Sequence, residues 1–463
     1  MSIDFSKKRF LVVDDQPMAR EALRTIAQSA GAFAVEFAVG YQDALYRIRN
    51  NPPDVILCDY MLGKDRSGQQ LLEEVRRFNL LTDEAIFIMV TGEQAYEQVV
   101  SAVELAPDEY IIKPFSPDKL LFRLERVAAR KEFFSPYYRL RRNGDYPGAL
   151  NTLGQLAKSE DGRQYRYEIM RQQAETMLAG GNPTAAETAY RSILENYQFP
   201  WAQAGIARSL HHQQRTSEAR EEIDRVVASA PHFFDAADLK AQICMAQGDH
   251  AEAQRVLDDV ARRTPRNYLR KRLLAEAATL NGDVETARNA MADVIENDTM
   301  PGAITLPDQL ALVRSYLAAN DPINAEKILY TIKESDLLYS ELAIQASYYA
   351  LLTLTLPSKG KPKLAGLRPA LMATPFDAAT HLDLLHAALS VGDDLLADTQ
   401  ATQLLSSHDA KKVFAVLRKY YALYGRESDL RALQREVALQ RIRIRESQAG
   451  ADLGEAAAAP DAS

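Results

Sequence analysis

The sequence predicts a multidomain protein: a doubly wound α/β domain with a five-stranded parallel sheet, followed by an all-α solenoid of helical hairpins. Two patterns support this fold class. In the first 125 residues, short apolar runs alternate with amphipathic helical patterns, whereas from about residue 137 Ala-rich helical patterns continue alone. A chain of 463 residues is also too long for one compact core, so two or more domains are expected.

Five short apolar runs predict the strands of the α/β domain. Their length and their β-branched residues are typical of buried parallel strands. Helical patterns lie between them, at 19–31, 41–50, 68–78 and 93–106. In such a sheet, a ligand binds beyond the carboxyl ends of the strands. The five runs are FLVVD (10–14), AVEFAV (34–39), DVILCDY (54–60), AIFIMVTG (85–92) and YIIKPF (110–115).

Repetition predicts the fold of the second part. Ala174, Ala207, Ala241 and Ala275 are spaced 33, 34 and 34 residues apart. Helical hairpins that bury their apolar faces only against their neighbours form a stacked solenoid. The pattern resembles tetratricopeptide repeats, and this resemblance implies a surface that binds protein partners. Three further columns keep the same spacing: Ala186, Ala219, Ala253 and Ala287; Tyr190, Ile223, Leu257 and Met291; Ile193, Val226, Val260 and Val294.

The domain limits follow from these patterns. We expect the α/β domain at 1–125, a helical linker at 126–140 and the solenoid at 141–446. The tail at 447–463 has small and acidic residues without a periodic face, so we expect it to be disordered. Pairs of Gly with Asp or Asn separate the predicted helices: Gly144-Asp145, Gly181-Asn182, Gly248-Asp249, Gly282-Asp283 and Gly392-Asp393.

Composition predicts a soluble cytoplasmic protein. Hydrophobic residues make up 47% and charged residues 25% of the chain, and no run of 18 apolar residues could cross a membrane. The first ten residues lack the apolar core of a secretory signal. Only Cys58 and Cys244 occur, so a disulfide framework is not expected. The net charge of −8 argues against general binding of DNA or RNA.

Polar residues follow the predicted strands where each one ends. Asp14 and Asp15 end the first strand, Asp59 the third, Thr91 the fourth and Lys113 the fifth. Taken alone, the adjacent aspartates have two interpretations: a cap for the next helix, or oxygen ligands for a cation. Three carboxylates at one site need a divalent cation and the lysine to offset their charge. A carboxylate can also act as a nucleophile toward a phosphoryl group.

These residues make the first 125 residues similar to the receiver domain of two-component response regulators, which has a flavodoxin-like fold. The resemblance implies that Asp59, in LCDYMLG, is the phosphoacceptor. It also implies a Mg²⁺ site made by Asp14, Asp15, Asp59 and the backbone carbonyl of Met61.

The same resemblance implies a switch around the phosphoryl group. Thr91 is the hydroxyl that moves toward the phosphoryl group, and Lys113 pairs with it. The bond from Lys113 to Pro114 matches a cis peptide of the family, and Tyr110 occupies its aromatic switch position. The loop YMLGKDRSGQQ (60–70) is longer than the usual form and lacks its proline.

Together these features predict a response regulator. A histidine kinase or a phosphotransfer protein would phosphorylate Asp59, and the repeats would then bind or release a protein partner. The receiver would catalyse only its own phosphoryl transfer and dephosphorylation, so no other enzyme activity is expected. No membrane or DNA partner is expected, and a homodimer is left open.

Two alternatives remain open at this point. An enzymatic output domain could lie in the divergent region 300–446, and a nucleic-acid-binding output could use the basic stretch 262–272, although this stretch more readily lines a solenoid surface. The pair His211-His212 has no obvious acidic or cysteine partner, so we expect it to pack or to face solvent.

Overall fold

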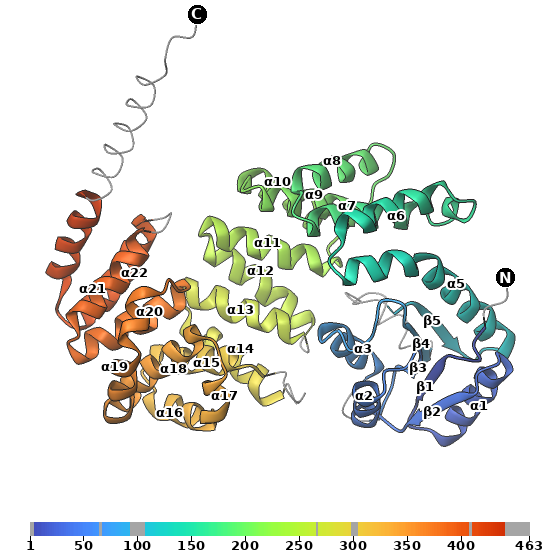
Figure 1. Ribbon diagram of the computed structural model, residues 1–463, viewed down its shortest axis with the longest axis horizontal. Coiled ribbons are helices and arrows are strands. Elements are labelled where there is room, and N and C mark those ends of the chain that lie inside the picture. The colour runs from blue at the N-terminus through green and yellow to red at the C-terminus, as the bar shows by residue number, and fades with distance from the viewer. Residues whose placement is uncertain are drawn as a thin grey trace, which may run out of the picture. The chain divides into compact units, whose positions relative to one another are not determined.

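The computed structural model describes residues 4–63, 67–92, 107–264, 267–297, 304–406 and 410–439. The chain forms two compact units, Met1–Leu273 and Leu274–Ser463, and the division falls inside the helix Tyr268–Asn281, α13 (Figure 1). The helix predicted at 93–106 and the tail predicted at 447–463 lie outside the described residues. Within the described residues, no helix combines the length and the apolar character needed to cross a bilayer.

Five parallel strands form one sheet in the order β2-β1-β3-β4-β5, which is the flavodoxin-like order. Each strand begins and ends within two residues of the apolar run that predicted it, and β3 is buried along its whole length. The fold class predicted for this part is confirmed. The strands are β1 (Arg9–Val13), β2 (Ala34–Ala38), β3 (Val55–Asp59), β4 (Ile86–Gly92) and β5 (Glu109–Lys113).

Helices cover both faces of the sheet (Figure 1). On one face, α1 (Pro17–Ser29) and α5 (Pro117–Arg142) pack through apolar side chains on strand residues that include Val12, Leu57 and Ile88. Because side chains alternate along a strand, the intervening strand residues face the other side. There they are covered by α2 (Tyr41–Asn50) and α3 (Gly68–Arg77).

Helix α5 belongs to two hydrophobic cores. It is 26 residues long and runs without a break through residue 125 and through the linker expected at 126–140. Its first half packs on the sheet through residues such as Leu124. Its second half packs through Phe134 and Tyr137 in the first helical hairpin, against α6 (Tyr146–Lys158). The expected linker is therefore part of a helix that both cores share.

The remaining helices of the first unit form consecutive hairpins. Each helix packs on the next, and every residue of the four predicted columns is buried, with at most 5% of its surface exposed. The apolar repeat pattern therefore marks the packing between helices. After the short helix η1 (Asp161–Arg163), the helices are α7 (Arg166–Ala179), α8 (Pro183–Leu194), α9 (Pro200–His212), α10 (Thr216–Ser229), α11 (Phe234–Gln247) and α12 (His250–Arg263).

The second unit continues as helices, which confirms the all-α prediction, but its hairpins are less regular. Its buried polar groups pair with one another: Arg314 with Asp383 at 2.7 Å, and His381 Nδ1 with Gln400 Oε1 at 2.6 Å. The helices are α14 (Val284–Asn297), α15 (Leu306–Ala318), α16 (Pro322–Thr331), α17 (Glu334–Leu338), α18 (Leu342–Thr355), α19 (Pro357–Ala373), α20 (Ala378–Val391), α21 (Asp394–Ser406) and α22 (Ala410–Leu423).

The turns inside the hairpins combine a left-handed residue with a helix cap. Gly181 has a φ of 79°, and the side chain of Asn182 then accepts a hydrogen bond from the amide of Ala185 at 3.1 Å. In the hairpin of α9 and α10, Gln214 takes the left-handed position with a φ of 62°, and Arg215 follows without a side-chain cap. A residue with a Cβ is strained in this conformation, so this turn is less favourable than its neighbours.

This difference predicts opposite effects of two substitutions. Gly181→Ala should lower the free energy of unfolding by about 1 kcal/mol through backbone strain alone, because a Cβ there would meet no atom within 4 Å. Gln214→Gly should stabilise the protein by relieving the same strain. Chemical denaturation of the full chain measures both, and a Gly181→Ala variant as stable as the wild type would contradict the explanation.

Candidate functional site

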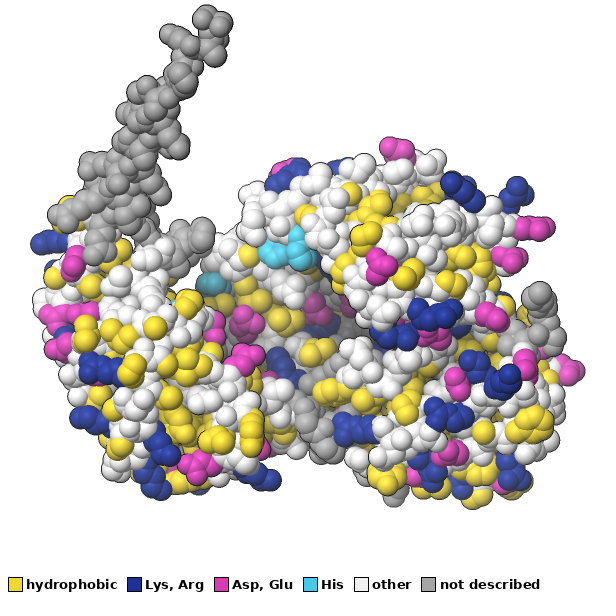
Figure 2. Space-filling view, viewed as in Figure 1, with side chains coloured by type: hydrophobic (Ala, Val, Ile, Leu, Met, Phe, Trp, Pro, Cys, Tyr) yellow, Lys and Arg dark blue, Asp and Glu magenta, His cyan; other side chains and the backbone are white. Residues whose placement is uncertain are grey.

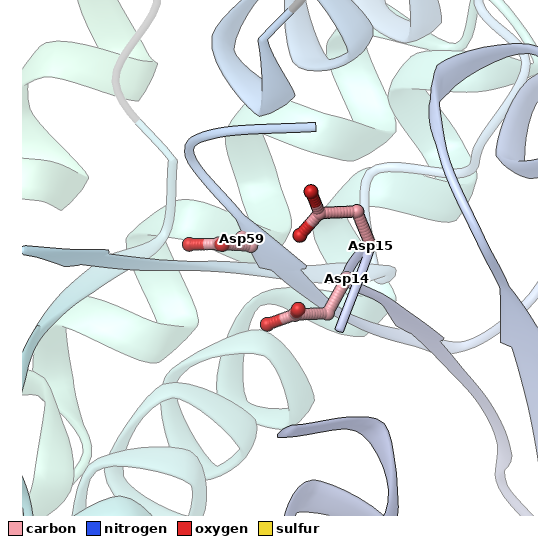
Figure 3. Close-up of side chains that lie close together, drawn as sticks. All are labelled: Asp14, Asp15 and Asp59. Carbon is pink, nitrogen blue, oxygen red and sulfur yellow. The ribbon is translucent and has the colours of Figure 1, made fainter. Parts of the chain in front are cut away.

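Most of the predicted site residues lie at or next to the carboxyl ends of β1, β3, β4 and β5. Val13 pairs with Cys58 in the β1–β3 register, so Asp14 and Asp59 follow side by side. In the β4–β5 register Gly92 pairs with Lys113. Figure 3 shows the side chains of Asp14, Asp15 and Asp59 gathered at this edge. The sheet order therefore brings together residues that are far apart in the sequence.

Three carboxylates form the centre of the site. Asp14, Asp15 and Asp59 each place an oxygen within 4.8 Å of the other two (Figure 3). Asp14 is fully buried and Asp59 is 7% exposed, whereas Asp15 is exposed. At a separation of 4.8 Å, two unit charges repel by about 3.5 kcal/mol at an effective dielectric constant of 20. The cluster therefore favours a cation.

Lys113 supplies part of the positive charge. Its Nζ atom lies 3.2 Å from Asp14 Oδ2 and 3.3 Å from Asp59 Oδ1. Burial opposes the charged ammonium, but the carboxylates of Asp59 and Asp14 outweigh it and raise the pKa of Lys113. The peptide bond from Lys113 to Pro114 is cis, as the sequence resemblance implied.

One lysine does not neutralise the cluster. Burial raises the pKa of Asp59 and the neighbouring Asp14 raises it further, although Lys113 acts in the opposite direction. Carboxylate oxygens are the ligands that Mg²⁺ takes in proteins. The donor set of Asp14, Asp15 and Asp59 therefore fits this ion. Met61, whose carbonyl is the fourth expected ligand, pairs with Ser67 in an isolated β-bridge.

The two switch candidates lie on the neighbouring strands. Thr91 is fully buried, and its hydroxyl donates to the carbonyl oxygen of Gly92 at 3.1 Å. Tyr110 is half-buried on β5 and pairs with Met89 in the strand register. Thr91 is thus next to the carboxyl end of β4, whereas Tyr110 is the second residue of β5, and the ion pairs with the acidic cluster are made by Lys113. Their switching roles stay predictions.

The capping interpretation of the aspartate pair is wrong. Gln16 is the N-cap residue of α1, and its side chain makes no capping hydrogen bond. Pro17 is the first residue of the helix, as expected. Asp14 Oδ1 instead accepts a hydrogen bond from the amide of Gln16 at 2.8 Å. Sequence reasoning also missed Arg20, whose guanidinium donates to the carbonyl oxygen of Asp14 at 2.7 Å. Its place in the first turn of α1 was the available signal.

The other candidates do not form a comparable centre. Within the described residues, the acidic triad is the one group of His, Cys, Asp or Glu residues placed to hold a metal, so His211-His212 does not add one. Arg270, in the basic stretch 262–272, was expected on the surface, but it is 1% exposed and pairs with Asp238 at 2.6 Å. On the face shown in Figure 2, basic and acidic side chains are interspersed over the described residues.

Comparison with protein families identifies both parts. Residues 10–125 match the response regulator receiver domain, and residues 138–199, 171–232 and 239–299 match the tetratricopeptide repeat. The chain carries a receiver domain followed by tetratricopeptide repeats. Both resemblances seen in the sequence are confirmed.

The receiver domain has named relatives. The phosphate regulon transcriptional regulatory protein PhoB of Pseudomonas aeruginosa is 37% identical over 123 residues, which are 27% of this chain and 52% of that protein. PhoB of Escherichia coli is 34% identical over 123 residues, with the same coverage of 27% and 52%. The chain thus spans about half the length of the curated relatives it matches.

Solved structures resemble each part separately. A CheY-like receiver domain from Methanospirillum hungatei is 30% identical and covers 27% of this chain and 96% of its own, with a TM-score of 0.25. A tetratricopeptide repeat protein from Parabacteroides merdae is 12% identical. The match covers 58% of this chain and 98% of that protein, with a TM-score of 0.38.

The acidic cluster predicts stabilisation by Mg²⁺. At about ten times its dissociation constant, Mg²⁺ should raise the free energy of unfolding by about 1.4 kcal/mol. Asp15→Asn should remove most of this effect, because it deletes the exposed carboxylate of the cluster. Calorimetry of metal-free protein with and without Mg²⁺ measures the shift.

Glu125→Gln is the matched control, since it removes the same charge from an exposed position on α5. It should respond to Mg²⁺ as the wild type does. Equal shifts in Asp15→Asn and in the wild type would contradict a metal site at this cluster.

Proposed function

We propose that this protein is a cytoplasmic response regulator that accepts a phosphoryl group on Asp59 and thereby changes protein binding by its repeats. The observation that carries the proposal is the placement of Asp59 between two further carboxylates and the ammonium of Lys113. This donor set suits a phosphoryl-transfer centre, which needs a nucleophile, a metal site and a fixed cation.

In the proposed reaction, a carboxylate oxygen of Asp59 forms a bond to phosphorus. The bond between phosphorus and its donor breaks, and the donor keeps the electron pair. A phosphohistidine in a histidine kinase or a phosphotransfer protein, or acetyl phosphate, can act as the donor. Mg²⁺ held by Asp14, Asp15, Asp59 and the carbonyl of Met61 would offset charge on the phosphoryl oxygens.

Lys113, Thr91 and Tyr110 would respond to the charge of the phosphoryl group. A phosphoryl group adds about −1.5 to −2 charges, so the ammonium of Lys113 gains a partner that competes with Asp14. The hydroxyl of Thr91 would leave Gly92 and donate to a phosphoryl oxygen, and Tyr110 would turn inward behind it. Lys113 is the last residue of β5, and α5 begins four residues later at Pro117, so a shift of this strand would reach the helix.

Helix α5 would carry the change to the repeats, because its two halves belong to the core of the receiver and to that of the first hairpin. The partner of the repeats would then be bound or released. The acidic net charge of −8 and the pairing of Arg270 with Asp238 support a protein partner over a nucleic acid.

Acetyl phosphate with Mg²⁺ should phosphorylate the full chain once, at Asp59. Intact-protein mass spectrometry should show the mass of one phosphoryl group, and this addition should be lost when Mg²⁺ is removed with EDTA. Asp59→Asn should show no addition, because its amide cannot act as the nucleophile. An unmodified wild type, or equal labelling of Asp59→Asn, would overturn the proposal.

A further inference from the structure

We propose that Gly68 is a positioning residue for Asp59: the missing side chain lets the first turn of α3 pack directly on the backbone of the phosphoacceptor. The inference rests on the proposed function, because it assigns Gly68 a role in the reaction of Asp59. Neither the acidic cluster nor its lysine involves this residue, which lies at the end of the loop that departs from the usual receiver pattern.

The contacts around Gly68 leave no room for a methyl group. A Cβ at this position would lie 2.2 Å from the backbone oxygen of Asp59, 2.7 Å from Cys58 Sγ and 3.0 Å from Met89 Sδ. The amide of Gly68 donates to the carbonyl oxygen of Tyr60 at 2.8 Å. The start of α3 is therefore held against the backbone that carries the phosphoacceptor.

The carbonyl of Asp59 has a second neighbour. The thiol of Cys58 donates to the same oxygen at 3.2 Å. The amide of the next residue, Tyr60, donates to Val90 on β4 at 2.8 Å. Gly68, the thiol and β4 thus fix the backbone on both sides of the Asp59 side chain.

Local conformation does not explain a glycine here. Gly68 is the first residue of α3, directly after the N-cap residue Ser67. It is not among the residues with a positive φ. Alanine is the better helix former, by up to about 1 kcal/mol in a helix interior. The close approach to Asp59 is the feature that requires glycine.

An added methyl group would displace the reacting carboxylate. Ordinary contact needs a separation of at least 3.4 Å, so the gap of 2.2 Å must open by more than an ångström. The nearest atom belongs to the backbone of Asp59 itself, at the end of β3, so no side-chain rotation relieves the clash and the backbone that carries the carboxylate must shift. A misplacement of about 1 Å in a reacting group can reduce a rate about 100-fold.

The test measures the rate of phosphorylation of the full chain by acetyl phosphate at saturating Mg²⁺. In Gly68→Ala the rate constant should fall about 10-fold to 100-fold. Gly31→Ala is the matched control, because Gly31 has a φ of 93° and a Cβ there would meet no atom within 4 Å. Gly31→Ala strains the backbone of the receiver domain at a position remote from Asp59, so this variant should keep the wild-type rate.

A double variant separates positioning from core packing. Cys58→Ala/Gly68→Ala removes the contact of the added methyl group with Cys58 Sγ, but the contact with the backbone oxygen of Asp59 remains. Its rate should stay about 10-fold or more below that of Cys58→Ala alone. Thermal midpoints measured in parallel report the stability of each variant.

The outcomes are distinct. Recovery of the rate in the double variant, or a rate in Gly68→Ala equal to that of Gly31→Ala, overturns the inference and leaves the proposed function intact. A wild type that is not phosphorylated overturns the proposed function and the inference together.

Discussion

The contact of Lys113 with the carboxylates of Asp14 and Asp59 is the interaction on which the site depends. It joins the ends of three strands, β1, β3 and β5, that are far apart in the sequence. The sheet places β3 beside β1, and the long side chain of Lys113 reaches both carboxylates from β5 although β4 lies between β3 and β5. One positive charge against three negative ones leaves the cluster short of a cation. The same imbalance would favour Mg²⁺, and the bound ion would then offset the negative charge of a phosphoryl group.

The second constraint is the sharing of α5 by two cores. A flexible linker would separate the chemistry of Asp59 from the repeats, but α5 starts four residues after the end of β5 and continues into the first hairpin. Apolar side chains anchor its first half on the sheet and aromatic side chains anchor its second half. A displacement at the end of β5 thus acts on a helix that both cores hold.

Periodicity made most of the fold predictable. Buried parallel strands are short apolar runs, and close helix packing selects small residues such as Ala207 at fixed intervals. Both patterns are therefore visible in the sequence. The acidic centre was predictable because strand ends of a parallel sheet meet at one edge. Its roles in phosphoryl transfer came from the family resemblance.

Several contacts could not be predicted because they depend on distances across the fold. The burial of Arg270 is set by Asp238, which lies on another helix. The bond of Arg20 to the carbonyl of Asp14 needs the angle at which α1 leaves β1. Local capping rules also favoured an aspartate as the cap of α1, but Asp14 is held by Lys113 and Gln16 takes the position.

The coupling of Asp59 to the repeats is the central claim, and hydrogen–deuterium exchange tests it most directly. The full chain would be compared with and without beryllofluoride, a phosphoryl mimic, in the presence of Mg²⁺. The account predicts altered exchange at the end of β5, along α5 and in α6, and none of these changes in Asp59→Asn. Changes confined to residues before α5 would contradict it.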